Sequence, residues 1–433
     1  MKWESRSLSR WAKSLVATGI SMCRSRSLRL NRRGAIGVIV ALLLPIIVGA
    51  TGLATDTIQM TLIRREMQRQ ADSGALAGAF ARSQSKPVAA TVTGDLAKNA
   101  NRTLTVAPII ENAPTVGAYA GSTNAVRVVL ATDVQLPFSR LFMPQTRLLV
   151  AATAAIISMG DYCVLALEKT DAAGINMGGN ASVDLSCGMA TNSTAANAVT
   201  SSGSAIVKAT PIAAVGGLQP SSNYVSPTVL VPYSVPQADP FARLPIPLLS
   251  GMASLNGSVK SHEIAILSPG RYAGMDLQGY TTLNPGVYFI DGGSLTIGAQ
   301  AIVQGDGVTI ILSSSKAETF SSSIATMSIN GGASVKLAAS TSGTYAGVLF
   351  YQDRRALDSG SNKVNGNATS RYQGAMYFPS QELHFSGTSG MTTDCIQLVG
   401  RRLVFIGNSI IRNVCPAGSG AQAFKGTRVR LVA

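Results

Sequence analysis

The sequence predicts a single N-terminal membrane-spanning helix, a small α+β unit, and then a mainly β region that makes up most of the chain. Three observations lead to this prediction. An apolar run follows a basic tail at residues 34–55, helix-compatible sequence continues to residue 81, and residues 161–433 are rich in Gly, Ser, Thr and Asn with short apolar runs. Long segments with helical periodicity are absent from that last region, which indicates β structure.

Residues 34–55 have the length and composition of a membrane span. No charged residue lies between Arg33 and Asp56, and as a helix residues 35–54 rise roughly 30 Å, about one hydrocarbon core. Eleven of those twenty residues are Ile, Leu or Val, which favours insertion by roughly 3 to 7 kcal/mol despite Pro45. Cleaved signals have shorter apolar stretches of about 7 to 15 residues, so we expect a retained anchor, although small residues near its end leave cleavage open.

The basic tail, residues 1–33, sets the expected orientation. It holds nine Lys or Arg and one acidic residue, Glu4, so it contributes 9 − 1 = +8 of the formal net charge of +15. By the positive-inside rule the tail stays in the cytoplasm and the remaining chain lies outside the membrane. The tail shows neither zinc-finger spacing nor a helix-turn-helix pattern, so no nucleic-acid partner is expected.

Residues 56–81 are expected to continue the membrane helix into water. The stretch lacks proline, and apolar residues recur at i, i+4 spacing in the pairs Ile58 and Leu62, Met67 and Ala71, and Ala75 and Ala79. Its second half is rich in Ala and Gly, which let another backbone approach closely. Two interpretations stay open: this face packs against the protein's own next domain, or it binds a partner.

A combined pattern runs from the start of the span through the helix that follows: an Arg-Gly start, an apolar run, an aspartate, and a glutamine followed by an alanine-rich helix. Its positions are Gly34, Pro45, Asp56, Gln68, Ala71, Asp72, Ala75, Leu76, Ala77, Gly78 and Ala79. The pattern resembles the N-terminal segment of the TadE/TadG-like proteins of tight-adherence (Flp) pilus assembly. The resemblance implies a non-enzymatic protein of the inner membrane, without cofactor, that helps to build or anchor an adhesive pilus. Its implied partners are other pilus-assembly proteins, bound through the Ala-rich helix or the β region.

Two departures from members of that group narrow the expectation. Pilin-like members trimmed by a prepilin peptidase carry Glu five residues into the mature chain, whereas this sequence has Ile39 there. We therefore expect a retained, TadG-like anchor rather than a processed pseudopilin. Larger members carry a metal site of pattern D-x-S-x-S. The stretch beginning at Asp358 has Gly360 and Asn362 where the hydroxyls belong, so no metal site is expected.

Four cysteines lie beyond the span, at Cys163, Cys187, Cys395 and Cys415, and the fifth, Cys23, lies in the basic tail. An even number outside is consistent with an oxidising compartment. Of three pairings, the two short loops 163–187 and 395–415 are preferred, each adding on the order of 3 kcal/mol, and they would staple the first and last parts of the β region. Zinc is disfavoured because the chain has only two histidines and no Cys-x2–4-Cys spacing among the external cysteines.

Residues 82–160 are expected to form the small α+β unit. A short helix is predicted around residues 93–102, and strands are predicted over residues 125–134 and 146–158, joined by the stretch LPFSRLFMP.

Two short motifs recur in the mainly β region, residues 161–433. G-x-[AS]-x-[VI] begins at Gly179, Gly203, Gly331 and Gly407, and L-x-P-G-x-Y begins at Leu267 and Leu283. Glycine permits a turn, and the alternating small and β-branched residues that follow make a short strand with one buried face. The repetition favours β-helix-like stacked coils, with a β-sandwich as the alternative.

A Pro-rich excursion, residues 217–250, interrupts the β region. It holds seven of the eighteen prolines, so we expect an extended surface segment without ordinary ladders or helices. The sequence does not choose between a hinge and a strap.

An exported β domain also fits two other functions. A β-helix lyase or hydrolase acting on polysaccharides would need charged groups on one face, and the candidates are Asp353, Arg354, Arg355, Asp358, Asp276 and Asp291. Such charges are also ordinary in solvated loops, and His262 and His384 lack a nucleophile motif such as G-x-S-x-G, so no catalytic residue is expected. Direct adhesion to glycans or surfaces through exposed Ser, Thr, Asn and Tyr is the other alternative.

Overall fold

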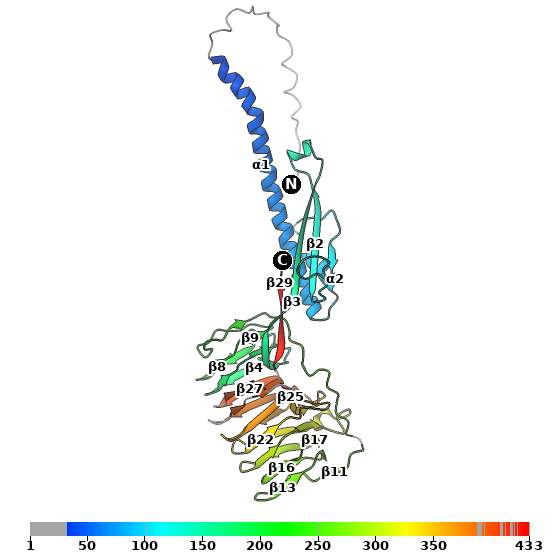
Figure 1. Ribbon diagram of the computed structural model, residues 1–433, viewed down its shortest axis with the longest axis vertical. Coiled ribbons are helices and arrows are strands. Elements are labelled where there is room, and N and C mark those ends of the chain that lie inside the picture. The colour runs from blue at the N-terminus through cyan, green and yellow to red at the C-terminus, as the bar shows by residue number, and fades with distance from the viewer. Residues whose placement is uncertain are drawn as a thin grey trace, which may run out of the picture. The chain divides into compact units, whose positions relative to one another are not determined.

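The structure is a computed structural model that describes residues 33–100, 102–249, 251–387, 392–393, 395–407, 410–411, 413–415, 419, 421 and 423–432. The expectations for residues 1–32, Cys23 among them, lie outside the described residues. The chain divides into two compact units, residues 1–65 with 132–148 and residues 66–131 with 149–433. The elements named below are labelled in Figure 1.

One helix, α1 (Arg33–Ser83), contains both the predicted span and its predicted continuation. Over residues 36–83 it is long and apolar enough to cross a membrane. Pro45 lies inside the helix without ending it. The predicted single N-terminal span is therefore confirmed as one long apolar helix.

The short elements after α1 are α2 (Val88–Lys98), β1 (Ile109–Glu111), β2 (Ala125–Val134), η1 (Ser139–Leu141) and β3 (Thr146–Ala166). β2 has the predicted bounds, and β3 continues eight residues beyond the predicted strand end because its last part enters the β region. The predicted helix bounds are wrong. α2 begins directly after Pro87, because a proline disfavours helical backbone in the residue before it, and it ends before Asn99.

The mainly β region is a parallel β-helix whose coils have three sides. In the coils of residues 254–338 each strand pairs in parallel with the strand three places later along the chain. The first face contains β11 (Ser254–Leu255), β14 (Gly270–Tyr272), β17 (Gly286–Asp291), β20 (Val308–Ser313), β23 (Val348–Gln352), β6 (Gly188–Thr191), β9 (Ile212–Ala214) and β10 (Leu230–Val231).

The other two faces follow the same rule. The second contains β12 (Ser258–Val259), β15 (Met275–Leu277), β18 (Ser294–Ile297), β21 (Thr326–Ile329), β24 (Ser361–Val364), β4 (Ile175–Gly178) and β7 (Val199–Ser201). The third contains β13 (Ile264–Leu267), β16 (Tyr280–Leu283), β19 (Ile302–Gly305), β22 (Ser334–Ala338), β26 (Thr392–Thr393), β28 (Ile410–Ile411), β5 (Ser182–Asp184) and β8 (Ile206–Lys208). The long strands β25 (Arg371–Gly387) and β27 (Cys395–Gly407) pass around corners. This parallel pairing confirms the favoured β-helix over the sandwich.

The spatial order of the coils differs from their order in the sequence. β27 pairs in parallel with β25 on one side and with both β3 and β4 on the other. The last coil in the sequence therefore stacks on the first, and the order in space is residues 254–411 followed by residues 163–231. We call the contact between these two coils the junction. The chain enters at the junction through β3 and leaves through β29 (Phe424–Leu431), which pairs antiparallel with β3 (Figure 1).

The Pro-rich segment supplies the connection that this order requires. The described residues 232–249 and 251–253 form what we call the return strap, which runs over the outside of the first face from one end of the coils to the other. Arg354 donates hydrogen bonds to the carbonyl oxygens of Leu244, at 2.8 Å, and of Phe241. The Tyr377 hydroxyl donates to Asp239 at 2.7 Å. The structure thus shows a strap rather than a hinge.

The expectation of no ladder in the Pro-rich excursion is wrong at one place. Leu230 and Val231 form β10 and pair in parallel with Ile212 and Ala213 of β9. The neighbouring prolines lie at positions 227 and 232, so both strand residues keep their N–H groups for pairing.

The recurring sequence motifs mark corners of the coil. Gly179, Gly203 and Gly407 have φ of +62°, +67° and +82°, and each stands before a strand of the third face. A side chain at Gly203 would meet the backbone of Gly179 in the next coil, which explains the glycine there. In the second motif Tyr272 and Tyr288 stack inside the coils with ring centroids 5.9 Å apart.

The junction also carries an ion pair network around one buried carboxylate. Glu168, which is 1% exposed, accepts hydrogen bonds from Arg401 Nε at 3.0 Å and from Arg402 Nη1 at 2.8 Å. Arg402 donates as well to Asp358, at 2.6 Å. Burial alone would raise the pKa of Glu168, but hydrogen bonds from Thr170 and from the two arginines outweigh it and lower the pKa to about 2.

We expect Glu168→Gln to destabilise the β-helix by roughly 3 kcal/mol at neutral pH, because two partly buried guanidinium groups lose the buried carboxylate that they share. The lowered pKa means that the stabilisation is complete above the ordinary value of 4.5 and is lost as the pH falls towards about 2. The difference in thermal unfolding midpoint between wild type and variant should therefore shrink over that range, as followed by circular dichroism of the full chain in detergent.

The matched control is Glu318→Gln, since this carboxylate is 85% exposed and lies 3.6 Å from Arg355. We expect a change of about 0.5 kcal/mol or less there. An equal loss of stability in both variants would show that the network at the junction has no special role.

Candidate functional site

The apolar part of α1 presents its side chains outward. Ile36, Leu42 and Ile46 are 67%, 68% and 65% exposed. A helix that is apolar on every side and uncovered by protein is stable in lipid rather than in water. The geometry agrees with the composition that predicts a membrane span.

Asp56 follows directly after the apolar run and is only 1% exposed. Its carboxylate accepts hydrogen bonds from the backbone N–H groups of Phe138, at 3.3 Å, and Ser139, at 2.5 Å, and from the Ser139 hydroxyl at 2.6 Å. One turn earlier Gly52 lies against the Phe138 ring, where a Cβ would clash. This aspartate therefore holds the loop between β2 and β3 on the helix. Its partners are 82 and 83 residues away in the chain, so the local pattern could not identify them.

The alanine-rich face of α1 is occupied by the protein's own side chains. Ala71, Ala75 and Ala79 are fully buried. Beside them a Cβ on Gly78 would lie 2.8 Å from both Val92 of α2 and Val126 of β2. The sequence left open whether this face packs against the protein's own next domain or binds a partner, and the structure shows the first.

The remaining positions of the pattern lie along the same helix. Gln68 donates to Asp72 at 2.8 Å and to the carbonyl oxygen of Ala151 at 3.1 Å. Leu76 and Ala77 are half-buried, and Gly34 and Pro45 lie in the apolar part. Ile58 and Leu62 are 61% and 55% exposed, so these two positions face outward, whereas Asp56 and Ile63 are buried.

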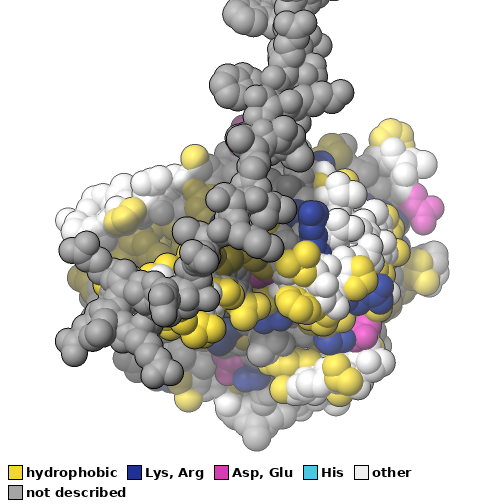
Figure 2. Space-filling view, turned by 90° about the horizontal axis from the view of Figure 1, so that it is seen from above, with side chains coloured by type: hydrophobic (Ala, Val, Ile, Leu, Met, Phe, Trp, Pro, Cys, Tyr) yellow, Lys and Arg dark blue, Asp and Glu magenta, His cyan; other side chains and the backbone are white. Residues whose placement is uncertain are grey.

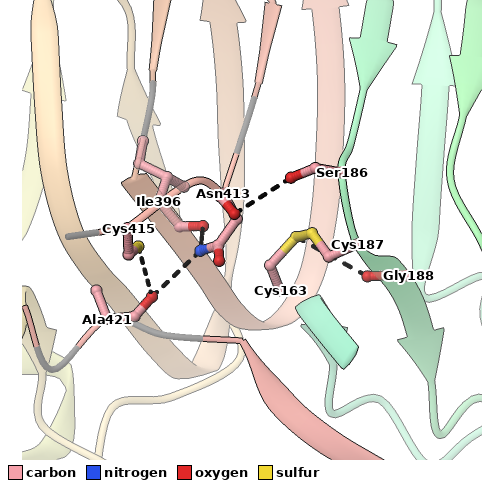
Figure 3. The surroundings of a disulfide bond; sticks show 8 residues. All are labelled: Cys163, Ser186, Cys187, Gly188, Ile396, Asn413, Cys415 and Ala421. Atoms are coloured by element: carbon pink, nitrogen blue, oxygen red, sulfur yellow. Dashed lines mark hydrogen bonds between the residues drawn. A yellow bond between two sulfur atoms is a disulfide. The ribbon is translucent and has the colours of Figure 1, made fainter. Parts of the chain in front are cut away.

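The four cysteines beyond the span pair as Cys163 with Cys187 and Cys395 with Cys415, with Cα atoms 5.9 Å and 4.5 Å apart. Figure 3 shows the first bridge beside Asn413, whose carbonyl oxygen accepts a hydrogen bond from Ser186 at 3.2 Å. The bridges do staple the first and last parts of the β region along the sequence, but these parts are not the two ends of the solenoid. Both lie at the junction, because the first and last coils in the sequence are neighbours in space.

The charged residues considered as catalytic candidates have structural partners. Asp353 is fully buried and accepts from Ser313 and from Arg355, both at 2.7 Å. Asp291 accepts from Arg271 Nε at 2.6 Å. Burial would raise the pKa of both carboxyls, but hydrogen bonds lower it, those from Ser315 and Arg271 at Asp291 and those from Arg355 and Ser313 at Asp353. A lowered pKa is opposite to what a general acid needs.

Two of the other candidates, Asp358 and His384, are joined through Arg402 and Glu382 to the ion pair network at the junction. Asp358 pairs with Arg402, Asp276 accepts from Gln278 at 2.6 Å, and His384 Nε2 lies 2.6 Å from Glu382. His262 lines a small pocket at another corner. Among the described residues, no three His, Cys, Asp or Glu side chains are grouped as metal ligands. On the face seen in Figure 2, charged side chains of both signs lie among hydrophobic and other groups.

Residues 34–83 match the family model described as "Putative Flp pilus-assembly TadE/G-like". This segment is TadE/G-like. The match spans α1 from its second residue to its end and confirms the resemblance. No curated protein and no solved structure matches the chain. The TadE/G-like segment thus includes Asp56 and the buried alanine face, while the β-helix lies outside the match.

We expect Gly78→Ala to lower the thermal unfolding midpoint. The new methyl group gains roughly 0.5 to 1 kcal/mol of helix propensity, but overpacking against Val92 and Val126 costs about 1 to 3 kcal/mol. Gly94→Ala in α2 is the matched control, because no atom beyond its chain neighbours and its own helix backbone lies within 4 Å of a Cβ there. That change should raise the midpoint, and a rise in both variants would contradict the close packing of this face.

Proposed function

We propose that this protein is a non-enzymatic component of a tight-adherence (Flp) pilus assembly or anchoring system. The observation that carries the proposal is the TadE/G-like segment, residues 34–83, whose apolar half is exposed as a membrane span would be. The structural partners of the candidate carboxylates support a role other than catalysis.

In this proposal α1 anchors the chain in the inner membrane, with the basic tail in the cytoplasm and the β-helix in the periplasm or beyond. The tail's charge of +8 supports this orientation through the positive-inside rule. The two disulfides support an oxidising compartment for the β-helix. The anchor is retained, in keeping with Ile39 at the position where processed pilins carry Glu.

The partners are other pilus-assembly proteins, and the β-helix is the favoured contact. The alanine-rich face of α1 is already packed against α2 and β2, so it offers little free surface. The β-helix presents exposed apolar side chains at its free end. Ile264 and Ile266 are 79% and 69% exposed in β13, whose outer edge has no strand beside it among the described residues.

The orientation is tested with a membrane-impermeant maleimide. The two disulfides use four of the five cysteines, so 5 − 4 = 1 remains, Cys23, whose thiol we expect to be free. In intact spheroplasts we expect no labelling of the protein. After detergent is added we expect labelling of that one thiol, and after reduction labelling of all five thiols, as measured by the mass of the protein. Labelling before detergent would place the tail outside and contradict the proposal.

The role of the β-helix is tested by replacing residues 163–423 with a short Gly-Ser linker. Tyr162 and Phe424 are paired neighbours in β3 and β29, so the antiparallel pair and the anchor stay intact. We expect cells carrying only this version to form no pili by electron microscopy. Normal pili with lost attachment would instead favour a surface adhesin.

Complementation by the full chain is the control, and equal abundance of both proteins in the membrane fraction shows that the replacement is stable. Cleavage of acidic polysaccharides by the purified full chain would favour the lyase or hydrolase alternative and contradict the non-enzymatic role.

A further inference from the structure

The loop between β2 and β3 is strongly apolar at its tip. Residues 136–144 read LPFSRLFMP, and Arg140 is their one charged residue. Leu141, Phe142 and Met143 are 75%, 87% and 55% exposed. Three adjacent large apolar side chains that face solvent mark a surface that contacts something apolar.

The loop is fixed to α1 at a defined level. The Asp56 carboxylate accepts hydrogen bonds from the N–H groups of Phe138 and Ser139 at the start of η1, and the Phe138 ring packs against Gly52. Gly52 lies in the last turn of the apolar run, and Asp56 is the first charged residue after it. The contact therefore lies where α1 leaves the hydrocarbon core. Loop and helix belong to the same compact unit, residues 1–65 with 132–148.

We propose that the loop of residues 136–144 inserts into the interfacial layer of the same bilayer that α1 crosses. Its apolar tip continues the lipid-facing surface of the helix, on which Leu53 is 60% exposed. Apolar groups of interfacial segments lie about 5–10 Å into the boundary between headgroups and acyl chains. Arg140 suits this position, because an arginine stem lies along lipid while its guanidinium reaches the phosphates.

A second contact changes what the anchor does. A lone helix is free to tilt and to rotate about its axis in the bilayer. With the loop inserted, the Asp56 contact sets the rotation and depth of α1 relative to the membrane surface. Asp56 is then a positioning residue. Its place in the TadE/G-like pattern is explained by the orientation of the anchor in the membrane, independently of any contact with the pilus.

The proposal is tested by tryptophan fluorescence of the full chain in phosphatidylethanolamine and phosphatidylglycerol vesicles with brominated acyl chains. Trp3 and Trp11 are first replaced by Phe, since they are the two tryptophans. In that background we expect Phe142→Trp to give blue-shifted emission, quenched at least about twofold more than Ile264→Trp on the β-helix. Leu42→Trp, inside the span, controls for insertion and should be quenched most by deeply placed bromines.

Leu141→Trp provides a second probe of the same loop, and quenching at either position supports insertion. Emission at both positions that resembles that of Ile264→Trp, while Leu42→Trp is quenched, overturns the proposal. Blue-shifted but unquenched emission overturns it as well, because the tip would then be covered by protein. Adding Asp56→Ala to Phe142→Trp should reduce the quenching, whereas unchanged quenching would remove Asp56 from this role. None of these outcomes depends on pilus assembly.

Discussion

Backbone pairing at the junction is the constraint on which the β-helix depends. β27 hydrogen-bonds to β25 on one side and to β3 and β4 on the other, so two segments far apart in the chain become one continuous stack. A coil of a parallel β-helix buries its apolar face only against its neighbours. If the junction opened, both coils would expose their inner faces and unpaired strand edges. The ion pair network around Glu168 and the two disulfides are concentrated at this place.

The chain enters and leaves the stack of coils at the junction, and this path also explains why the return strap is needed. Because the stack begins at residue 254 and ends at residue 231, the chain must travel back along the whole first face. Proline suits such a connection, since it favours extended backbone and removes N–H groups that would otherwise need partners. The strap covers aromatic side chains such as Tyr351 and Tyr377, which are fully buried. The first face is therefore packed on both sides and forms a second core.

The TadE/G-like segment contains two different uses of a helix surface. Its first half is apolar on all sides and suits lipid, while its second half is lined by small residues that let α2 and β2 approach closely. Asp56 separates the two halves. A buried carboxylate needs hydrogen-bond donors. Here the donors are the N–H groups of Phe138 and Ser139 and the hydroxyl of Ser139, all in the β2–β3 loop. One residue thus marks the end of the span and ties the β2–β3 loop to it.

The sequence by itself determined the span, the bounds of β2, the β-helix-like repetition and the pairing preferred for the cysteines, because these depend on local composition, periodicity and spacing. Only the tertiary structure decided the order of the coils, the path of the strap, the partners of Asp56 and the place of the disulfides. Such features depend on contacts between segments as far apart as Glu168 and Arg402. Nothing in either local sequence records which distant strand will lie beside it, since parallel strands with alternating apolar residues offer nearly equivalent edges.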